Sequence, residues 1–165
     1  IIAPQIQPPA PYFAAVKNGD YDGRLFLVNA RNGKVMDLMG GFYFITKDKR
    51  YLFSEYASDG INGLEIVDLD KGVVIYSTKK LPCEIMGWYE KGGEYIFTAP
   101  IGTPTEKVPP DGTLLVYSFD FHTNTFTEKF ITESVLSSYK RLSYEYDPRK
   151  QVDCKVNYVE SGAVK

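Results

Sequence analysis

An internal repeat of β-hairpins is the feature that most constrains the fold of this chain. Residues 25–33 and 64–72 have the same length, and in each an apolar strand ends in Asn29 or Asp68. A glycine, Gly33 or Gly72, follows four residues later. Glycine adopts left-handed backbone at no steric cost, so this spacing is typical of a hairpin turn. The sequence therefore predicts a repeated strand–turn–strand unit.

A second hairpin repeats at a shift of 44 residues. Phe44 aligns with Trp88, Tyr51 with Tyr95, Leu52 with Ile96 and Phe53 with Phe97. Fainter third copies lie at residues 114–130 for the first kind of hairpin and 144–156 for the second. Together they predict about three units of four short strands each.

Composition supports an all-β chain with at most one short helix. Of the 165 residues 15% are aromatic, and 14 Gly and 10 Pro favour pleated sheet and tight turns. We expect a Pro-rich N-terminal tether over residues 1–11 and a single all-β domain over 12–165. One short helix is predicted within residues 132–142, with a strand as the alternative, because four apolar side chains have helical spacing there. These are Val135, Leu136, Tyr139 and Leu142.

Four strands per unit at this spacing resemble the blades of β-propellers, broadly the WD40-like, TolB-like and YVTN-like repeats. The resemblance rests on strand rhythm and on the Asp/Asn-x-x-x-Gly turn, without a Trp-Asp or Gly-His dipeptide or a kelch double glycine. It implies antiparallel hairpins in about three propeller-blade-like four-stranded units. A hairpin-rich β-sandwich is the alternative. Propellers usually have four to eight blades, so the chain could also be a fragment or could complete a ring by self-association.

Residues 100–112 interrupt the rhythm with a long loop that contains four prolines. Proline does not fit a central strand, and stiffened loops on β scaffolds often carry binding sites. We predict a contact surface here, and an idle insertion is the alternative. Its predicted binding residues are Pro104, Val108, Pro109, Pro110 and Asp111.

A calcium site is the sharpest metal hypothesis. Asn18, Asp20 and Asp22, followed by Gly23, copy the opening of a calcium-binding loop, in which oxygen ligands alternate before a glycine bend. The twelfth position is Asn29 instead of a bidentate Glu, so an ordinary turn is the alternative. No other cofactor is predicted.

Catalytic motifs are absent from the sequence. His122 is the only histidine and falls in a predicted turn, so a zinc site has no usual ligand set. No Gly-x-Ser-x-Gly elbow occurs, and carboxylates such as Glu55 and Glu65 lie where turn formers are expected. We expect no enzymatic activity and assign no catalytic residue.

Charge and the N-terminal segment bear on partners and location. A net charge of −2 creates no broad electrostatic field that would attract nucleic acid or anionic lipid, and the Lys79-Lys80 pair is interpreted as solvated. No apolar run is long enough for a membrane span. The Pro-rich opening is similar to the tether that follows a removed export signal, so we expect an exported protein, whether periplasmic, cell-surface or secreted. Cys83 and Cys154 fit one disulfide or two buried thiols.

These observations favour an exported, non-enzymatic module that binds a protein partner through loops or a sheet surface. Two alternatives stay open: a calcium-dependent or small-ligand-binding domain of propeller type, and a piece of a larger propeller enzyme. Self-association is a further possibility.

Overall fold

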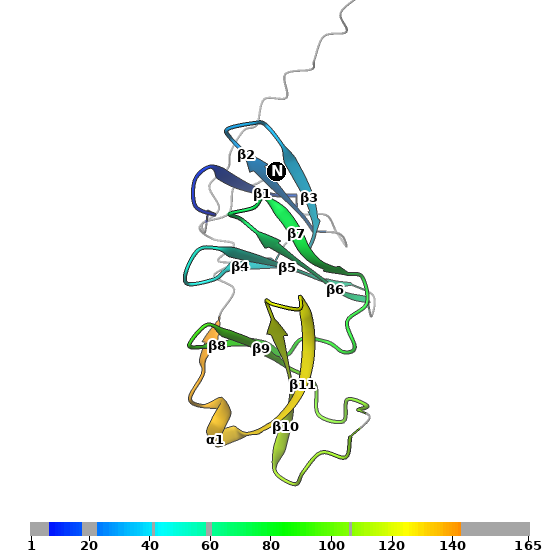
Figure 1. Ribbon diagram of the computed structural model, residues 1–165. Coiled ribbons are helices and arrows are strands. Elements are labelled where there is room, and N and C mark those ends of the chain that lie inside the picture. The colour runs from blue at the N-terminus through cyan, green and yellow to red at the C-terminus, as the bar shows by residue number, and fades with distance from the viewer. Residues whose placement is uncertain (1–6, 18–22, 41, 59–60, 106, 143–165) are drawn as a thin grey trace, which may run out of the picture.

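The computed structural model describes residues 7–17, 23–40, 42–58, 61–105 and 107–142. These residues form three antiparallel sheets, of three, four and five strands, and one short helix. The sheets follow one another in chain order from top to bottom in Figure 1. The prediction of an all-β fold with at most one short helix is confirmed for this part of the chain.

Each sheet is built from strands that are close in sequence. The first sheet has the order β1-β2-β3, the second β4-β5-β6-β7 and the third β11-β10-β9-β8-β12. The first contains β1 (Tyr12–Lys17), β2 (Arg24–Asn29) and β3 (Val35–Met39). The second contains β4 (Phe42–Ile45), β5 (Tyr51–Ser58), β6 (Ile61–Asp68) and β7 (Val73–Thr78). The third contains β8 (Gly87–Lys91), β9 (Glu94–Thr98), β10 (Thr113–Asp120), β11 (Thr125–Thr132) and β12 (Lys140–Leu142).

The repeated Asn/Asp turn has the same geometry in the first two sheets. The Gly33 N–H donates to the Asn29 carbonyl at 2.8 Å, and the Gly72 N–H donates to the Asp68 carbonyl at 2.8 Å. Both glycines have positive φ, 69° and 65°, and Asn124 takes this role after β10 with a φ of 53°. Strands β2, β6 and β10 are therefore each followed by a turn whose fifth residue has positive φ.

The aligned aromatic residues of the second repeat also occupy equivalent positions. Phe44 lies opposite Phe53 in the β4–β5 pair, and Trp88 lies opposite Phe97 in the β8–β9 pair. The rings of Phe44 and Phe53 stack with centroids 4.6 Å apart, and Trp88 meets Phe97 edge-on at 5.2 Å. The alignment of these two hairpins is confirmed.

The second sheet is buried on both faces, because apolar residues occupy successive positions along its central strands and successive side chains point to opposite faces. In β5, Leu52 packs toward the first sheet and Phe53 toward the third. The cluster shared with the first sheet includes Tyr12, Leu25, Leu27, Leu38, Tyr43, Leu52, Val67 and Leu69. The cluster shared with the third includes Phe44, Phe53, Leu64, Ile66, Trp88, Tyr95, Phe97, Tyr117 and Phe119. Two cores thus hold three sheets in a stack.

The predicted helix is present but shorter than its apolar spacing suggested. Helix α1 spans Glu133–Leu136, is capped by Thr132 and buries no residue. The Ser137 hydroxyl donates to the Ser134 carbonyl and the Ser138 hydroxyl to the Val135 carbonyl, which favours termination here. The chain then pairs with β8 as β12, so Leu142 reaches the core from a strand.

Part of the predicted tether lies against the first sheet. The Gln7 side-chain amide exchanges two hydrogen bonds with the backbone of Ala14, and Pro8 is buried. The faint hairpin at residues 144–156 falls outside the described residues and remains a prediction. Within the described part of the chain, no helix has the length and hydrophobicity needed to cross a membrane.

Candidate functional site

The loop between β9 and β10 presents the most exposed apolar side chains among the described residues. Ile101 is 97% exposed and Val108 91%, whereas the next most exposed large hydrophobic residue, Met86, is at 55%. The loop projects from the lower part of the molecule in Figure 1. All five residues predicted to form the contact surface are exposed: Pro104, Val108, Pro109, Pro110 and Asp111. The structure therefore leaves these five side chains accessible.

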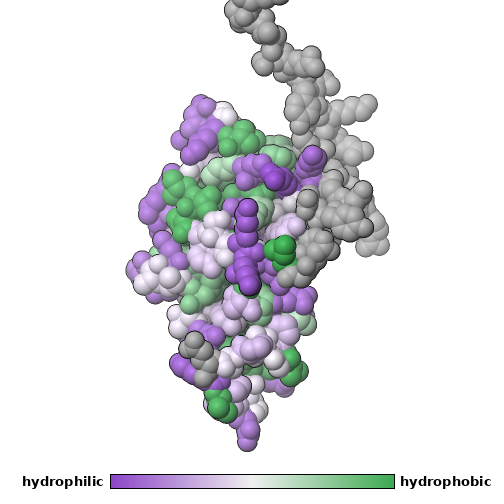
Figure 2. Space-filling model, turned by 90° about the vertical axis from the view of Figure 1, so that its right-hand side faces the viewer, coloured by the Kyte–Doolittle hydropathy of each residue, from purple (hydrophilic) through white to green (hydrophobic). Residues whose placement is uncertain are grey.

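Elsewhere on the surface, apolar side chains are more dispersed. Figure 2 shows one face of the molecule, on which hydrophobic residues form several separate groups between hydrophilic ones. Exposed apolar residues outside the loop include Phe13 on β1 and Val135 on α1, which belong to different parts of the fold. Such scattered residues are normal on soluble proteins, so the loop is distinguished by how far its two aliphatic side chains stand out.

A hydrogen bond between residues three positions apart forms a turn at each end of this loop. At its start, the Thr103 hydroxyl donates to the Pro100 carbonyl at 2.8 Å, and at its end the Thr113 hydroxyl donates to the Pro110 carbonyl at 2.6 Å. In between, the Thr105 hydroxyl donates to Glu128 Oε2 on β11 at 3.2 Å. Proline and these bonds restrict the unbound loop, which lowers the entropy lost when a partner binds.

A half-buried polar cluster lies beneath the start of the loop. Tyr117 Oη donates to Glu128 Oε1 at 3.3 Å, on the carboxylate that also accepts from Thr105. Burial, with smaller contributions from the carboxylates of Glu128 and Glu84, raises the pKa of the Cys83 thiol to about 11. A thiol with so high a pKa is a poor nucleophile at neutral pH. Cys154 lies outside the described residues, so pairing of the two cysteines remains open.

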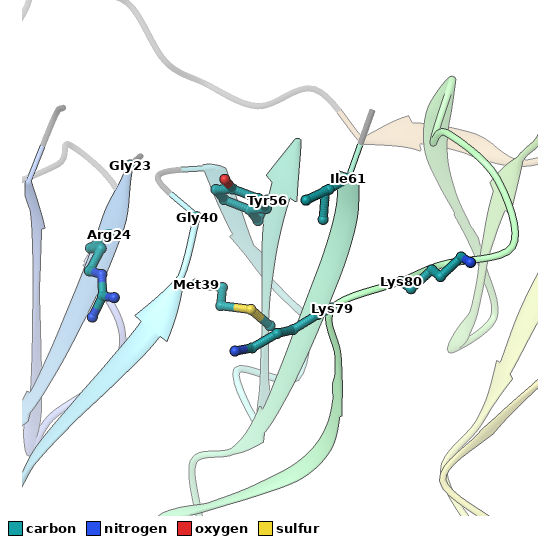
Figure 3. A pocket seen from close by; sticks show the side chains of 8 residues that line it. All are labelled: Gly23, Arg24, Met39, Gly40, Tyr56, Ile61, Lys79 and Lys80. Atoms are coloured by element: carbon teal, nitrogen blue, oxygen red, sulfur yellow. The ribbon is translucent and has the colours of Figure 1, made fainter. Parts of the chain in front are cut away.

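A pocket of about 590 Å³ opens where the first and second sheets meet. Its lining combines two glycines, three basic residues and three apolar or aromatic residues: Gly23, Arg24, Met39, Gly40, Tyr56, Ile61, Lys79 and Lys80. In Figure 3, Tyr56 and Ile61 lie next to each other, and Lys79 extends past Met39 toward the strand that carries Arg24. None of these eight described residues is acidic, so together they contribute positive charge to the lining.

The predicted calcium ligands Asn18, Asp20 and Asp22 lie outside the described residues, and this site remains a prediction. Within the described part of the chain, no group of three or more His, Cys, Asp or Glu side chains could hold a metal ion. His122 is exposed in the turn after β10, where its backbone N–H donates to Asp120 Oδ1 at 2.7 Å.

Two of the described carboxylates, Asp68 and Glu65, have structural partners. Asp68 is 1% exposed, and its carboxylate lies 3.4 Å from an Arg50 guanidinium nitrogen. Glu65 accepts from the Met39 N–H at 2.6 Å and from the Ser77 hydroxyl at 3.1 Å. These groups tie turns and sheets together, a role that the sequence pattern alone did not reveal.

No protein-family model, curated protein or solved structure matches this chain. Sequence analysis located the loop from its prolines but missed the pocket. The pocket had no local signal, because Arg24, Tyr56 and Lys79 come together only when the two sheets stack.

Proposed function

We propose that this chain is a non-catalytic binding module that engages a protein partner through the loop of residues 100–112. The observation that carries this proposal is the near-complete exposure of Ile101 and Val108 on a loop with a hydrogen-bonded turn at each end. When a partner removes exposed apolar side chains from water, the free energy of the complex falls. Because the loop is already restricted, little of this gain in affinity is lost to ordering the loop.

The scaffold of this proposed module consists of propeller-blade-like units. Support comes from the equivalence of β5–β7 with β9–β11 and from a middle sheet that is packed on both faces. Self-association to complete a ring is a competing proposal, and light scattering distinguishes the two. Our proposal expects a monomer of 18.6 kDa, whereas ring completion requires a higher mass.

We also propose that the module is exported. The Pro-rich segment at residues 1–11 and the Tyr-rich, Cys-poor composition support this location. Fractionation of cells that express the natural gene tests it: the protein should leave the cytoplasm. Recovery of the mature chain from the cytoplasm alone would contradict it.

Site-specific photo-crosslinking tests the loop directly. A photo-reactive amino acid at position 101 or 108 is expected to capture a protein partner from an extract of the source cells. The matched control is the same group at Arg31, which is also exposed but lies in the β2–β3 turn of the first sheet. Capture from positions 101 and 108 but not from 31 supports the proposed contact surface.

A paired variant checks that the crosslink reports binding. Ile101→Ser combined with Val108→Ser should abolish capture by a probe at position 104, since the apolar contact is lost while the loop anchors remain. Equal capture from position 31, or capture that survives the double substitution, would show that the loop is not the contact surface.

A further inference from the structure

The pocket between the first two sheets has a composition that points to a ligand. Glycine allows close backbone contact at its edge: Gly40 has a φ of 84°, and a Cβ there would lie 1.8 Å from the Glu55 carbonyl oxygen. Gly63 lies nearby, and a Cβ there would contact the Met39 methyl group at 3.5 Å. A larger residue at position 40 would therefore force the backbones of Gly40 and Glu55 apart.

Two cations line this space, and they differ in whether a carboxylate already pairs with them. Arg24 pairs with Asp37, although both side chains are about half exposed, and Asp37 does not line the pocket. Lys79 has no salt bridge within the described part of the chain. The carboxylate of Glu65, which binds the Met39 backbone, is already occupied by two donors. An anionic group could therefore bind Lys79 without displacing an internal carboxylate, and it would share Arg24 with Asp37.

The other half of the lining is apolar. Met39 and Tyr56 are partly buried, and Ile61 is 50% exposed at the start of β6. Figure 3 shows Tyr56 and Ile61 side by side, with Met39 between them and Arg24 in this view. A thioether is polarizable and adapts its shape, so Met39 suits contact with a flat apolar group.

We propose that this pocket binds a small molecule that carries a carboxylate or phosphate on an apolar body. Arg24 and Lys79 hold the anionic group, and Met39, Tyr56 and Ile61 contact the apolar body. Guanidinium and ammonium groups both bind such oxygens by charge-assisted hydrogen bonds. The site is separate from the loop of residues 100–112, so either proposal can fail without the other.

The three methionines provide a direct test. In protein labelled with ¹³C at the methionine methyl groups, Met39 reports on the pocket, while Met36 and Met86 lie outside its lining. Titration with phenyl phosphate and separately with benzoate should shift the Met39 signal in a saturable way. Comparison of the two probes tells whether phosphate or carboxylate is preferred, and binding of either supports the site. The signals of Met36 and Met86 should stay in place.

Variants and neutral probes separate the two halves of the site. Lys79→Gln should weaken binding by at least about tenfold, since a hydrogen bond to a charged group contributes that much. The control Lys47→Gln, an exposed lysine in another loop, should leave the affinity unchanged. Benzyl alcohol and inorganic phosphate, each lacking one half of the ligand, should also bind at least about tenfold more weakly.

Three results would overturn the proposal. The first is a Met39 signal that does not respond to either anionic probe up to about 10 mM. The second is equal affinity of the Lys79→Gln and Lys47→Gln variants. The third is binding of benzyl alcohol or inorganic phosphate as tight as that of phenyl phosphate.

Discussion

The packed interface between the second and third sheets and the loop of residues 100–112 use apolar residues in opposite ways. At the interface, Trp88 and Phe53 are each 1% exposed and their rings meet at 5.2 Å. On the loop, Ile101 and Val108 are more than 90% exposed. Burial of a large side chain contributes about 1.5–3 kcal/mol to folding, and an exposed one contributes almost none.

This contrast separates stability from recognition within one chain. The stacked sheets should account for nearly all of the free energy of unfolding. The loop should account for very little of it, so that its apolar side chains remain available to a partner. Changes at the interface should therefore unfold the protein, whereas changes in the loop should affect binding alone.

The largest effect is expected from Trp88→Ala. Its ring contacts Phe44, Phe53 and Phe97, and its Nε1 donates to Glu55 Oε2 at 3.3 Å. Removal of the ring should lower the free energy of unfolding by about 3–5 kcal/mol through lost burial and a cavity. Urea denaturation measures this, with Ile101→Ala as the loop counterpart, expected to change stability by about 0.5 kcal/mol or less. Similar losses for both variants would remove the distinction between the regions.

A second pair of variants compares glycines with positive φ in the two settings. Gly112→Ala in the loop meets open space, so only backbone strain of about 1–2 kcal/mol is expected. Gly40→Ala adds a clash with the Glu55 carbonyl and should cost about 3 kcal/mol or more. Thermal denaturation of both variants provides the comparison. Equal melting temperatures would mean that the β3–β4 connection is not tightly packed against β5.

Much of the scaffold follows from local sequence. The Asn29, Asp68 and Asp120 turns could be located because each needs a left-handed residue four positions later, a requirement met by Gly33, Gly72 and Asn124. The stacking of three sheets could not be derived in the same way. It depends on which face each strand presents to a neighbour, and a middle sheet with two apolar faces lacks the simple polar alternation that marks one.

The candidate sites divide similarly. The loop of residues 100–112 was found because its prolines exclude a strand, but its anchor from Thr105 to Glu128 joins residues on different elements. The helix was expected to reach Leu142, because Tyr139 and Leu142 fit helical spacing. In the structure, residues 140–142 instead pair with β8 as a strand. Long-range pairing outweighed local periodicity there.

A smaller, pH-dependent effect is expected at Glu94 on the outer face of the third sheet. Burial alone raises the pKa of Glu94, but hydrogen bonds from Lys129, Tyr139 and Ser118 outweigh it and hold the pKa below its usual range. A carboxyl group with a lowered pKa in the folded state stabilises that state above its unfolded pKa of about 4.3. This contribution is lost as the pH falls through the folded pKa.

Glu94→Gln should therefore destabilise the protein at pH 7 by about 1 kcal/mol or less, as for a partly exposed ion pair. The difference from wild type should shrink as the pH falls below about 4. Urea denaturation at pH 7 and below pH 4 measures this difference in stability, with Glu133→Gln on the exposed helix as the control. A difference that is independent of pH would show that the carboxylate charge is not responsible.

The most direct test replaces residues 101–111 with a short Gly-Ser link and measures melting temperature and partner capture on the same protein. Our account predicts a melting temperature within about 2 °C of wild type, because the replaced side chains are largely exposed, together with loss of the partner captured through position 101 or 108. For this variant the photo-reactive group is placed within the new link. A fall in melting temperature comparable to that of Trp88→Ala, or unchanged capture, would contradict the separation of a stable scaffold from a binding loop.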